Sequence, residues 1–141
     1  MNIRDVMTPN PRAVAPGDSI QNAARIMRDE DTGVVPVVDN GRTVGLVTDR
    51  DIVIRAVADG GTLNRPISEI CTSAVVSASP DMSTREAAQL MSDHQVRRLP
   101  VVENDRLVGI VSIGDLAVKE GKDSRTGDTL QAISEGVKER G

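Results

Sequence analysis

One pattern of hydrophobic and polar positions occurs twice along the chain. Its first occurrence begins with a short apolar strand at 12–15, and a helix with aliphatic residues at helical spacing follows. Two aliphatic strands at 34–38 and 43–48 come next, joined through an Asn-Gly pair that is typical of a hairpin turn. A second helix starts near Asp51. This block predicts the order strand, helix, strand, strand, helix.

The second occurrence repeats this order. A strand is expected at 75–79, and Ser83 with Glu86 has the spacing of a capping box at the start of the next helix. Two aliphatic strands and a helix over 115–120 complete the block. The apolar stripes of the first helix in each block are Ile20, Ala23, Ala24 and Met27, and then Ala87, Leu90 and Met91.

The two blocks are copies of one sequence. A shift of 64 residues aligns 6–57 with 70–121 without a gap, and it superimposes identical residues such as Gly45 with Gly109. One copy of about fifty residues is marginal as an independent fold. We therefore expect an α/β protein in which two tandem β-α-β-β-α repeats pack with pseudo-two-fold symmetry and bury their aliphatic faces.

The repeat defines the expected domains. Repeat one covers 1–60, a Gly- and Pro-containing linker covers 61–66, and repeat two covers 67–121. The tail at 122–141 begins polar and can form a short amphipathic helix that covers an edge or contacts a second chain, with solvated disorder as the alternative. Its apolar positions are Leu130, Ile133 and Val137.

Composition narrows the classes of partner. With 17 basic and 21 acidic residues the net charge is −4, which argues against a general nucleic-acid binder. No apolar run approaches the ~20 residues that span a bilayer. No secretory signal is visible after Met1, and the single cysteine, Cys71, fits a reducing cytoplasm. The chain has no Phe, Tyr or Trp, so a flat ligand would lie between aliphatic side chains.

The phrases "GLVTDRD" and "GIVSIGD" occupy matching places in the two copies. Thr48 with Asp51, and Ser112 with Asp115, have the spacing of a helix N-cap, which alone would account for them. Each phrase also stands where a strand leads into a helix, where α/β folds bind ligands and where free amides meet phosphate. A carboxylate there suits a ribose, because it can accept hydrogen bonds from two vicinal hydroxyls.

Both copies resemble cystathionine β-synthase (CBS) domains, and the pair resembles a Bateman module. The resemblance covers roughly 1–121 and rests on "VMTPNP", "AARIM" with "AAQLM", "VVPVVDNGRTVGLVTDRD" and "RRLPVVENDRLVGIVSIGD". The arrangement is most similar to small stand-alone bacterial members of the hypoxic response type. The resemblance implies nucleotide sites between the copies, in which Asp51 and Asp115 hold ribose hydroxyls and Thr48 and Ser112 help to bind phosphate.

The two implied sites are unequal. Arg97 and Arg98 precede the repeated proline, Pro100, of repeat two, where repeat one has Gly33 and Val34. Related modules often place a basic pair on phosphate at this position, whereas the alternative is that these arginines pair with surface acids.

The resemblance also implies that the ribose carboxylate of one copy faces the basic pair of the other. It therefore joins Thr48 and Asp51 with the arginine pair in one dominant site. The site around Ser112 and Asp115 would then lack a phosphate clamp and would be weaker.

Other reactive residues give weak signals. His94 is the only histidine, and no His, Cys and carboxylate residues have metal-ligand spacing. Cys71 aligns with Met7, so it is expected to be a half-buried packing residue rather than a nucleophile. We expect neither a catalytic residue nor a metal site, and the chain is not expected to be an enzyme.

The sequence thus predicts a cytoplasmic regulatory or energy-sensing module that binds AMP, ADP, ATP or S-adenosylmethionine and requires no other cofactor. It would form a homodimer through aliphatic helix faces, including the Ile20, Ala23, Ala24 and Met27 stripe, and act on a separate, unknown effector protein. No nucleic acid or membrane is expected as a partner. The alternative is a ligand-independent dimerisation or protein-interaction module, in which both phrases are only helix caps.

Overall fold

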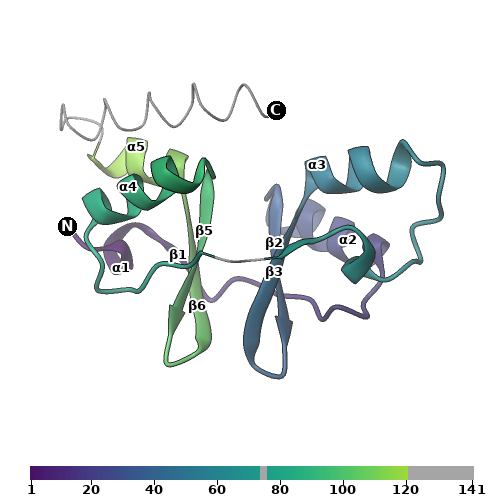
Figure 1. Ribbon diagram of the computed structural model, residues 1–141, viewed down its shortest axis with the longest axis horizontal. Coiled ribbons are helices and arrows are strands. Elements are labelled where there is room, and N and C mark those ends of the chain that lie inside the picture. Colours follow the sequence, from purple (N-terminus) through teal and green to yellow (C-terminus); the bar gives the residue numbers. More distant parts are fainter. Residues whose placement is uncertain (74–75, 121–141) are drawn as a thin grey trace. The chain divides into compact units, whose positions relative to one another are not determined.

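The computed structural model describes residues 1–73 and 76–120, which form two units of helices and strands (Figure 1). The first-repeat unit contains residues 11–73 and 105–107. The second-repeat unit contains residues 1–10, 76–104 and 108–120. Each unit has one three-stranded sheet, so the expected α/β class is confirmed. The predicted tail helix lies outside the described residues.

The first-repeat unit has the strand order β2-β3-β4, and both strand pairs are antiparallel. Helices α2 and α3 contact β2 and β3 respectively, and they also contact each other. Its elements are α2 (Ile20–Glu30), β2 (Val34–Asp39), β3 (Arg42–Thr48), α3 (Asp49–Ile52), the π-helix η1 (Val53–Val57), the 3-10 helix η2 (Ile67–Glu69) and β4 (Thr72–Ser73).

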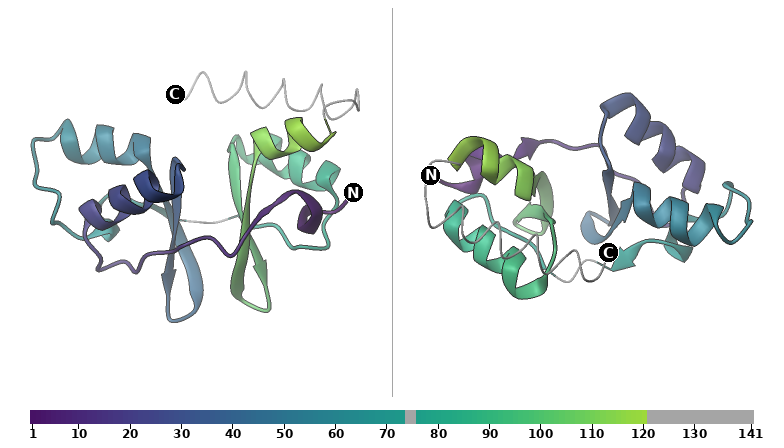
Figure 2. Two further views of the ribbon diagram at one scale, coloured as in Figure 1. Left: turned by 180° about the vertical axis from the view of Figure 1, so that it is seen from behind. Right: turned by 90° about the horizontal axis from the view of Figure 1, so that it is seen from above.

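The second-repeat unit has the strand order β1-β6-β5. Helix α5 contacts both α4 and α1, and Figure 2 shows α1 and β1 beside α5 and β6. Its elements are α1 (Ile3–Val6), β1 (Thr8–Pro9), α4 (Thr84–His94), β5 (Arg98–Glu103), β6 (Arg106–Ser112, of which 106–107 belong to the first-repeat unit) and α5 (Ile113–Glu120).

The opening segment of each repeat completes the sheet of the other repeat. In the second-repeat unit, Thr8 of β1 lies opposite Ile110 of β6. In the first-repeat unit, Thr72 of β4 lies opposite Leu46 of β3. The predicted domain boundaries follow the duplication along the chain, whereas the compact units exchange these opening segments. Because β1 and β4 have two residues each, they give no periodic signal, and the sequence did not predict them.

The glycine of each repeated phrase allows the exchanged segment to approach. A Cβ on Gly45 would lie 2.7 Å from the carbonyl oxygen of Thr72. A Cβ on Gly109 would lie 3.0 Å from the carbonyl oxygen of Thr8. Real Cβ atoms do not tolerate the first distance without a shift of backbone. The first letter of each phrase is therefore required by strand pairing rather than by ligand chemistry.

Most predicted elements are confirmed. Both hairpins are present, and their central residues have positive φ, at 50° and 82° for Asn40 and Gly41 and at 52° and 63° for Asn104 and Asp105. Positive φ at both positions is the type I′ geometry that suits the twist of two-residue hairpins. The Oγ of Ser83 accepts a hydrogen bond from the Glu86 amide at 3.1 Å, which gives one half of the predicted capping box.

The predicted strand at 12–15 is wrong, because only Val14 bridges to Val37 in a parallel pairing. Its amide donates to the Pro36 carbonyl, and the chain turns away at Pro16. Within the described part of the strand predicted at 75–79, only Ala78 forms such a bridge, to Val101, so that prediction is wrong there as well.

Each unit has its own aliphatic core, as the composition predicts. The stripe that we expected to serve dimerisation is used in this core, since Ile20 and Ala23 are 0% exposed and Met27 is 8% exposed. That expectation is therefore wrong, because the amphipathic face packs on its own sheet. Half-exposed apolar side chains occur instead along η1, at Val53, Ile54 and Val57.

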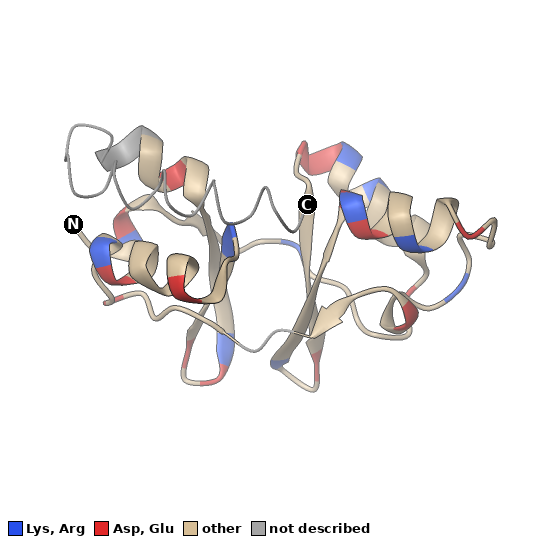
Figure 3. Cartoon of the chain, turned by 45° about the horizontal axis from the view of Figure 1, so that its top comes forward, with Lys and Arg blue, Asp and Glu red and all other residues tan. Residues whose placement is uncertain are grey.

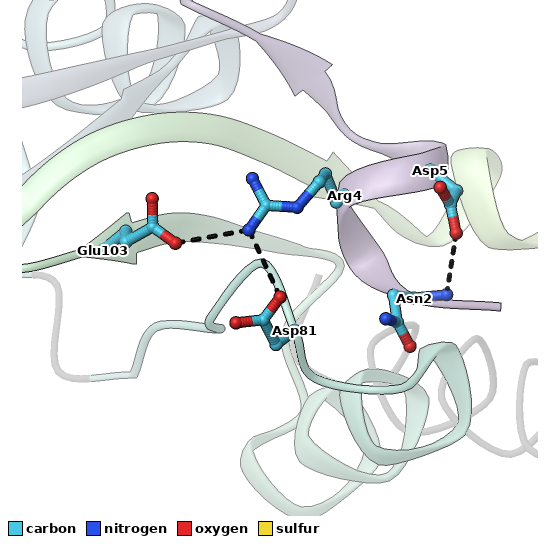
Figure 4. Close-up of polar contacts among 5 residues, drawn as sticks. All are labelled: Asn2, Arg4, Asp5, Asp81 and Glu103. Carbon is cyan, nitrogen blue, oxygen red and sulfur yellow. Dashed lines mark hydrogen bonds and ion pairs between the residues drawn. The ribbon is translucent and has the colours of Figure 1, made fainter.

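Helix α1 is anchored to the second-repeat unit by burial and by one arginine. Ile3 is 0% exposed, and its amide donates to the Met82 carbonyl at 2.9 Å. Nη2 of Arg4 donates to Asp81 at 3.2 Å and to Glu103 at 3.3 Å (Figure 4). These hydrogen bonds, with that to Asp81 the larger cause, raise the pKa of the Arg4 guanidinium. Figure 4 also shows the Asn2 amide donating to Asp5.

The close approach at Gly45 predicts that adding one methyl group there destabilises the fold. Gly45→Ala should reduce the free energy of unfolding by about 1–3 kcal/mol, because β4 must move away from β3. Gly17→Ala is the matched control, since its Cβ would meet no atom within 4 Å. Chemical denaturation of both variants measures the difference. Equal stabilities of the two variants would contradict the assignment.

Candidate functional site

The first candidate site is the turn from β3 into α3. Thr48 has extended backbone, with φ −113° and ψ 161°, and is the N-cap residue of the helix. Its Oγ1 accepts a hydrogen bond from the Asp51 amide at 3.0 Å. In return, Oδ2 of Asp51 accepts from the Thr48 amide at 2.9 Å. These reciprocal bonds form a capping box, so the structural interpretation of this phrase is confirmed.

The second candidate site is the corresponding turn from β6 into α5. Oγ of Ser112 accepts from the Asp115 amide at 3.1 Å, and Oδ2 of Asp115 accepts from the Ser112 amide at 2.8 Å. The two turns therefore share one hydrogen-bond geometry. Each pair of side chains is fixed by the backbone, which orients a carboxylate at the start of a helix in both units.

The cap uses only one oxygen of the Asp51 carboxylate. The other oxygen, Oδ1, lies 3.9 Å from Nε of Arg55, which forms a loose ion pair. The Arg55 guanidinium is also fixed by a second contact, because its Nη1 donates to the Ile70 carbonyl at 3.2 Å. The Asp51 side chain is 13% exposed, so it is shielded but can still be reached from solvent. This carboxylate can cap the helix and accept hydrogen bonds from a ligand at the same time.

In each unit, a backbone hydrogen bond joins the helix start of the turn to the residue just before β2 or β5. In the first-repeat unit the Asp49 amide donates to the Gly33 carbonyl at 3.0 Å. In the second-repeat unit the Ile113 amide donates to the Arg97 carbonyl at 2.8 Å. The backbone of Arg97 therefore lies next to the Ser112 turn of its own unit. The sequence did not identify Asp49 or Arg55 as neighbours of the Asp51 turn.

The six predicted site residues fall in both units. Thr48 and Asp51 are together in the first-repeat unit. The second-repeat unit holds the remaining residues, which are Arg97, Arg98, Ser112 and Asp115. The pairing of Asp51 with the arginines stays a prediction from the resemblance. Arg97 is exposed and Arg98 is half-buried, and no carboxylate within 1–73 or 76–117 forms an ion pair with either.

Charged residues cluster at the start of α3 (Figure 3). Asp49 and Asp51 lie in its first turn, with Arg50 between them in sequence. Cys71 lies near this region and packs partly buried against the core, as expected. Burial raises the pKa of the Cys71 thiol, so the unreactive neutral form is favoured at neutral pH.

Two further properties concern only the described residues. Within them, no group of three or more His, Cys, Asp or Glu residues is placed to hold a metal ion. None of the helices described is both long and apolar enough to cross a membrane.

Known proteins similar to the chain share its arrangement. The CBS domain model matches residues 3–57 and 67–119. The CBS domain-containing protein YhcV of Bacillus subtilis is 43% identical over 133 residues, which cover 94% of this chain and 95% of that protein. Hypoxic response protein 1 of Mycobacterium tuberculosis is 37% identical over 116 residues, with 81% of each chain covered.

Solved structures have the same fold. Hypoxic Response Protein I with two coordinated zinc ions has a TM-score of 0.76 at 36% identity, covering 84% of this chain and 98% of that chain. The CBS domain pair of MJ0100, in complex with 5′-methylthioadenosine and S-adenosyl-L-methionine, has a TM-score of 0.76 at 31% identity, covering 87% and 98%.

A third structure, PAE2072 from Pyrobaculum aerophilum complexed with AMP, has a TM-score of 0.77 at 26% identity, covering 86% of this chain and 94% of that chain. The expected resemblance is confirmed by sequence and by fold. With matches over both repeats and relatives of nearly the same length, the chain belongs to the CBS domain family as a tandem pair of CBS domains.

Proposed function

We propose that this CBS pair binds an adenine nucleotide at its repeated turns and acts as a regulatory or energy-sensing module without catalytic activity of its own. The observation that carries the proposal is the Asp51 carboxylate, which the backbone holds by one oxygen while the other forms a loose ion pair with Arg55. The AMP complex of PAE2072 and the adenosine-derivative complex of MJ0100 support an adenine ligand.

The proposed roles follow from the chemistry of each side chain. Asp51 and Asp115 accept hydrogen bonds from ribose hydroxyls, and Thr48 and Ser112 lie close enough to assist a phosphate. The arginine pair at 97–98 supplies the positive charge for phosphate, because guanidinium groups form bidentate bonds with its oxygens. AMP, ADP, ATP and S-adenosylmethionine all carry the adenosine that these turns would bind, and no further cofactor is required.

We also propose that the module forms homodimers and transmits its state to a separate effector protein in the cytoplasm. The π-helix η1 supplies an apolar surface for the dimer, which we call the η1 surface: Val53, Ile54 and Val57, exposed by 54%, 51% and 56%. Val53 and Val57 are spaced as i and i+4, which are neighbours on a helix surface, and Ala56 of the same segment is 0% exposed. Neither nucleic acid nor membrane is proposed as a partner, given the net charge of −4.

A ligand-independent dimerisation module is the second candidate function. It is favoured by the complete hydrogen-bond geometry of both caps, which explains Thr48, Asp51, Ser112 and Asp115 without any ligand. The two candidates differ in one measurable property, because only the first predicts that adenine compounds stabilise the folded protein.

A thermal-shift series tests the proposal directly. A ligand at about one hundred times its dissociation constant should stabilise the fold by ~2.7 kcal/mol. The series contains AMP, ADP, ATP, S-adenosylmethionine and 5′-methylthioadenosine. If none of them raises the melting temperature, the dimerisation module is favoured instead.

Variants at the first turn separate binding from capping. Asp51→Ala should reduce the affinity for the ligand about ten- to a hundredfold, because charge-assisted hydrogen bonds contribute ~1.5–3 kcal/mol. The same change removes a cap bond. Ser19→Ala is a matched control in the same unit, since Ser19 Oγ accepts from the Asn22 amide at 3.1 Å in the cap of α2. The control should lose stability and keep its affinity.

The arginine pair should act on phosphate rather than on adenosine. Replacing both Arg97 and Arg98 with Ala should lower the affinity for AMP about tenfold or more and that for adenosine little. The reason is that the phosphate dianion of AMP loses two guanidinium partners. Calorimetric titration gives both affinities, and added salt should reduce the wild-type preference for AMP. Arg85→Ala with Arg106→Ala changes the net charge equally at exposed positions of repeat two. Equal effects of both double variants would contradict the role.

The η1 surface predicts the oligomeric state. Sedimentation should give twice the 15.0 kDa mass of the chain, and Ile54→Asp should shift the protein toward monomer, because a charge would be buried at the interface. Val44→Asp, at an apolar position of β3 that is 40% exposed, is the control and should remain dimeric. A wild-type monomer at high concentration, with and without ligand, would refute the dimer.

A further inference from the structure

The two repeats differ in charge at one place beside the cap. Repeat two has Arg97 and Ile113 there, and the same 64-residue shift places Gly33 and Asp49 at these positions in repeat one. The backbone hydrogen bond between the two positions is kept in both units, at 2.8 Å and 3.0 Å. One local backbone structure therefore carries a cation in one unit and an anion in the other.

The Asp49 carboxylate occupies the side-chain space of residue 33. A Cβ built on Gly33 would lie 3.1 Å from Oδ2 of Asp49 and 3.3 Å from its Oδ1. Oδ1 also accepts a hydrogen bond from the Arg50 amide at 2.9 Å, which holds the carboxylate in place. A residue larger than glycine at 33 would require this carboxylate to shift by a few tenths of an ångström. The glycine at 33 therefore leaves the space that the Asp49 carboxylate occupies.

Helix capping explains only part of this arrangement. An acid in the first turn favours the helix electrostatically, and Asp49 is such an acid. That effect requires neither glycine at 33 nor contact with it. It also does not explain why repeat two has Arg97 where repeat one has Gly33. The paired exchange at both positions points instead to the charge that a ligand at this turn would meet.

We propose that Asp49 selects ligands by charge at the Thr48–Asp51 turn. Its carboxylate, adjacent in sequence to Thr48, disfavours each added phosphate charge relative to neutral or cationic adenosine derivatives. This inference rests on the proposed function, and it names the residue that tunes the site.

The size of the effect follows from the distance and the dielectric. Asp49 is exposed, so its interaction with phosphate acts through a dielectric close to that of water. A single charge and a phosphate dianion roughly 6–12 Å apart then give a penalty of about three- to tenfold in affinity. Salt weakens this penalty, because exposed charges are screened. Adenosine carries no charge and is not affected in this way.

Calorimetric titration of the full-length protein with adenosine, AMP and ATP tests this inference. Asp49→Asn should raise the affinity for AMP about three- to tenfold and that for ATP more, with adenosine changed by less than about twofold. The gain should shrink at high salt. Asp49→Glu keeps the charge and should keep the wild-type ratio of AMP to adenosine affinity. Asp39→Asn is the charge-matched control at an exposed position of the same unit and should also keep the wild-type ratio.

The possible failures can be distinguished. If the wild type and Asp49→Asn bind none of the three compounds, the proposed function fails and this inference fails with it. If adenine compounds bind but Asp49→Asn leaves the ratio unchanged, only the inference is overturned. An equal gain with Asp39→Asn would also overturn it, because the effect would then belong to net charge rather than to this position. Circular dichroism confirms that each variant is folded.

Discussion

The close approach of two backbones at Gly45 and Gly109 underlies the rest of the structure. At each glycine, a two-residue strand from the opening of the other repeat adds to the sheet. A side chain at Gly45 would meet the Thr72 carbonyl oxygen at 2.7 Å, so pairing in its present form depends on the missing methyl group. Each three-stranded sheet therefore contains residues of both repeats. This arrangement explains physically why the pattern occurs twice within one short chain.

The same strands end at the candidate sites. Three residues after Gly45, β3 gives way to α3, and Thr48 and Asp51 satisfy each other's amides. The capping box fixes the carboxylate without using all of its acceptor capacity, because a carboxylate has two oxygens and several lone pairs. Capping and ligand binding are thus compatible uses of one side chain. A choice between them cannot be made from the phrase alone, since both require the same residues at the same spacing.

The sequence predicted the parts of the fold whose signal extends over many residues. Helices α2 and α4 and both hairpins have periodic apolar positions or turn residues, and the structure confirms them. The strands β1 and β4 have two residues each and depend on partners distant in sequence, so local patterning could not reveal them. The apolar stripe of α2 was mistaken for a dimer face, because amphipathicity shows that a face is buried but not what buries it. The π-helical turn that exposes Val53 and Ile54 has no sequence signal that we could recognise.

Duplication also explains how the two sites could diverge without loss of the fold. The bond from the residue 49 amide to the residue 33 carbonyl, and its counterpart from 113 to 97, use only backbone atoms, so the side chains at these positions can change. Asp49 and Arg97 are exposed, and substitutions at exposed positions usually have small effects on stability. The local charge is therefore opposite in the two repeats. Repeat one has Gly33 and Asp49 at these positions, whereas repeat two has Arg97 and Ile113. The hydrogen bonds that hold each carboxylate stay the same, whereas the electrostatic environment of each turn differs, and a pair of unequal sites is the expected consequence.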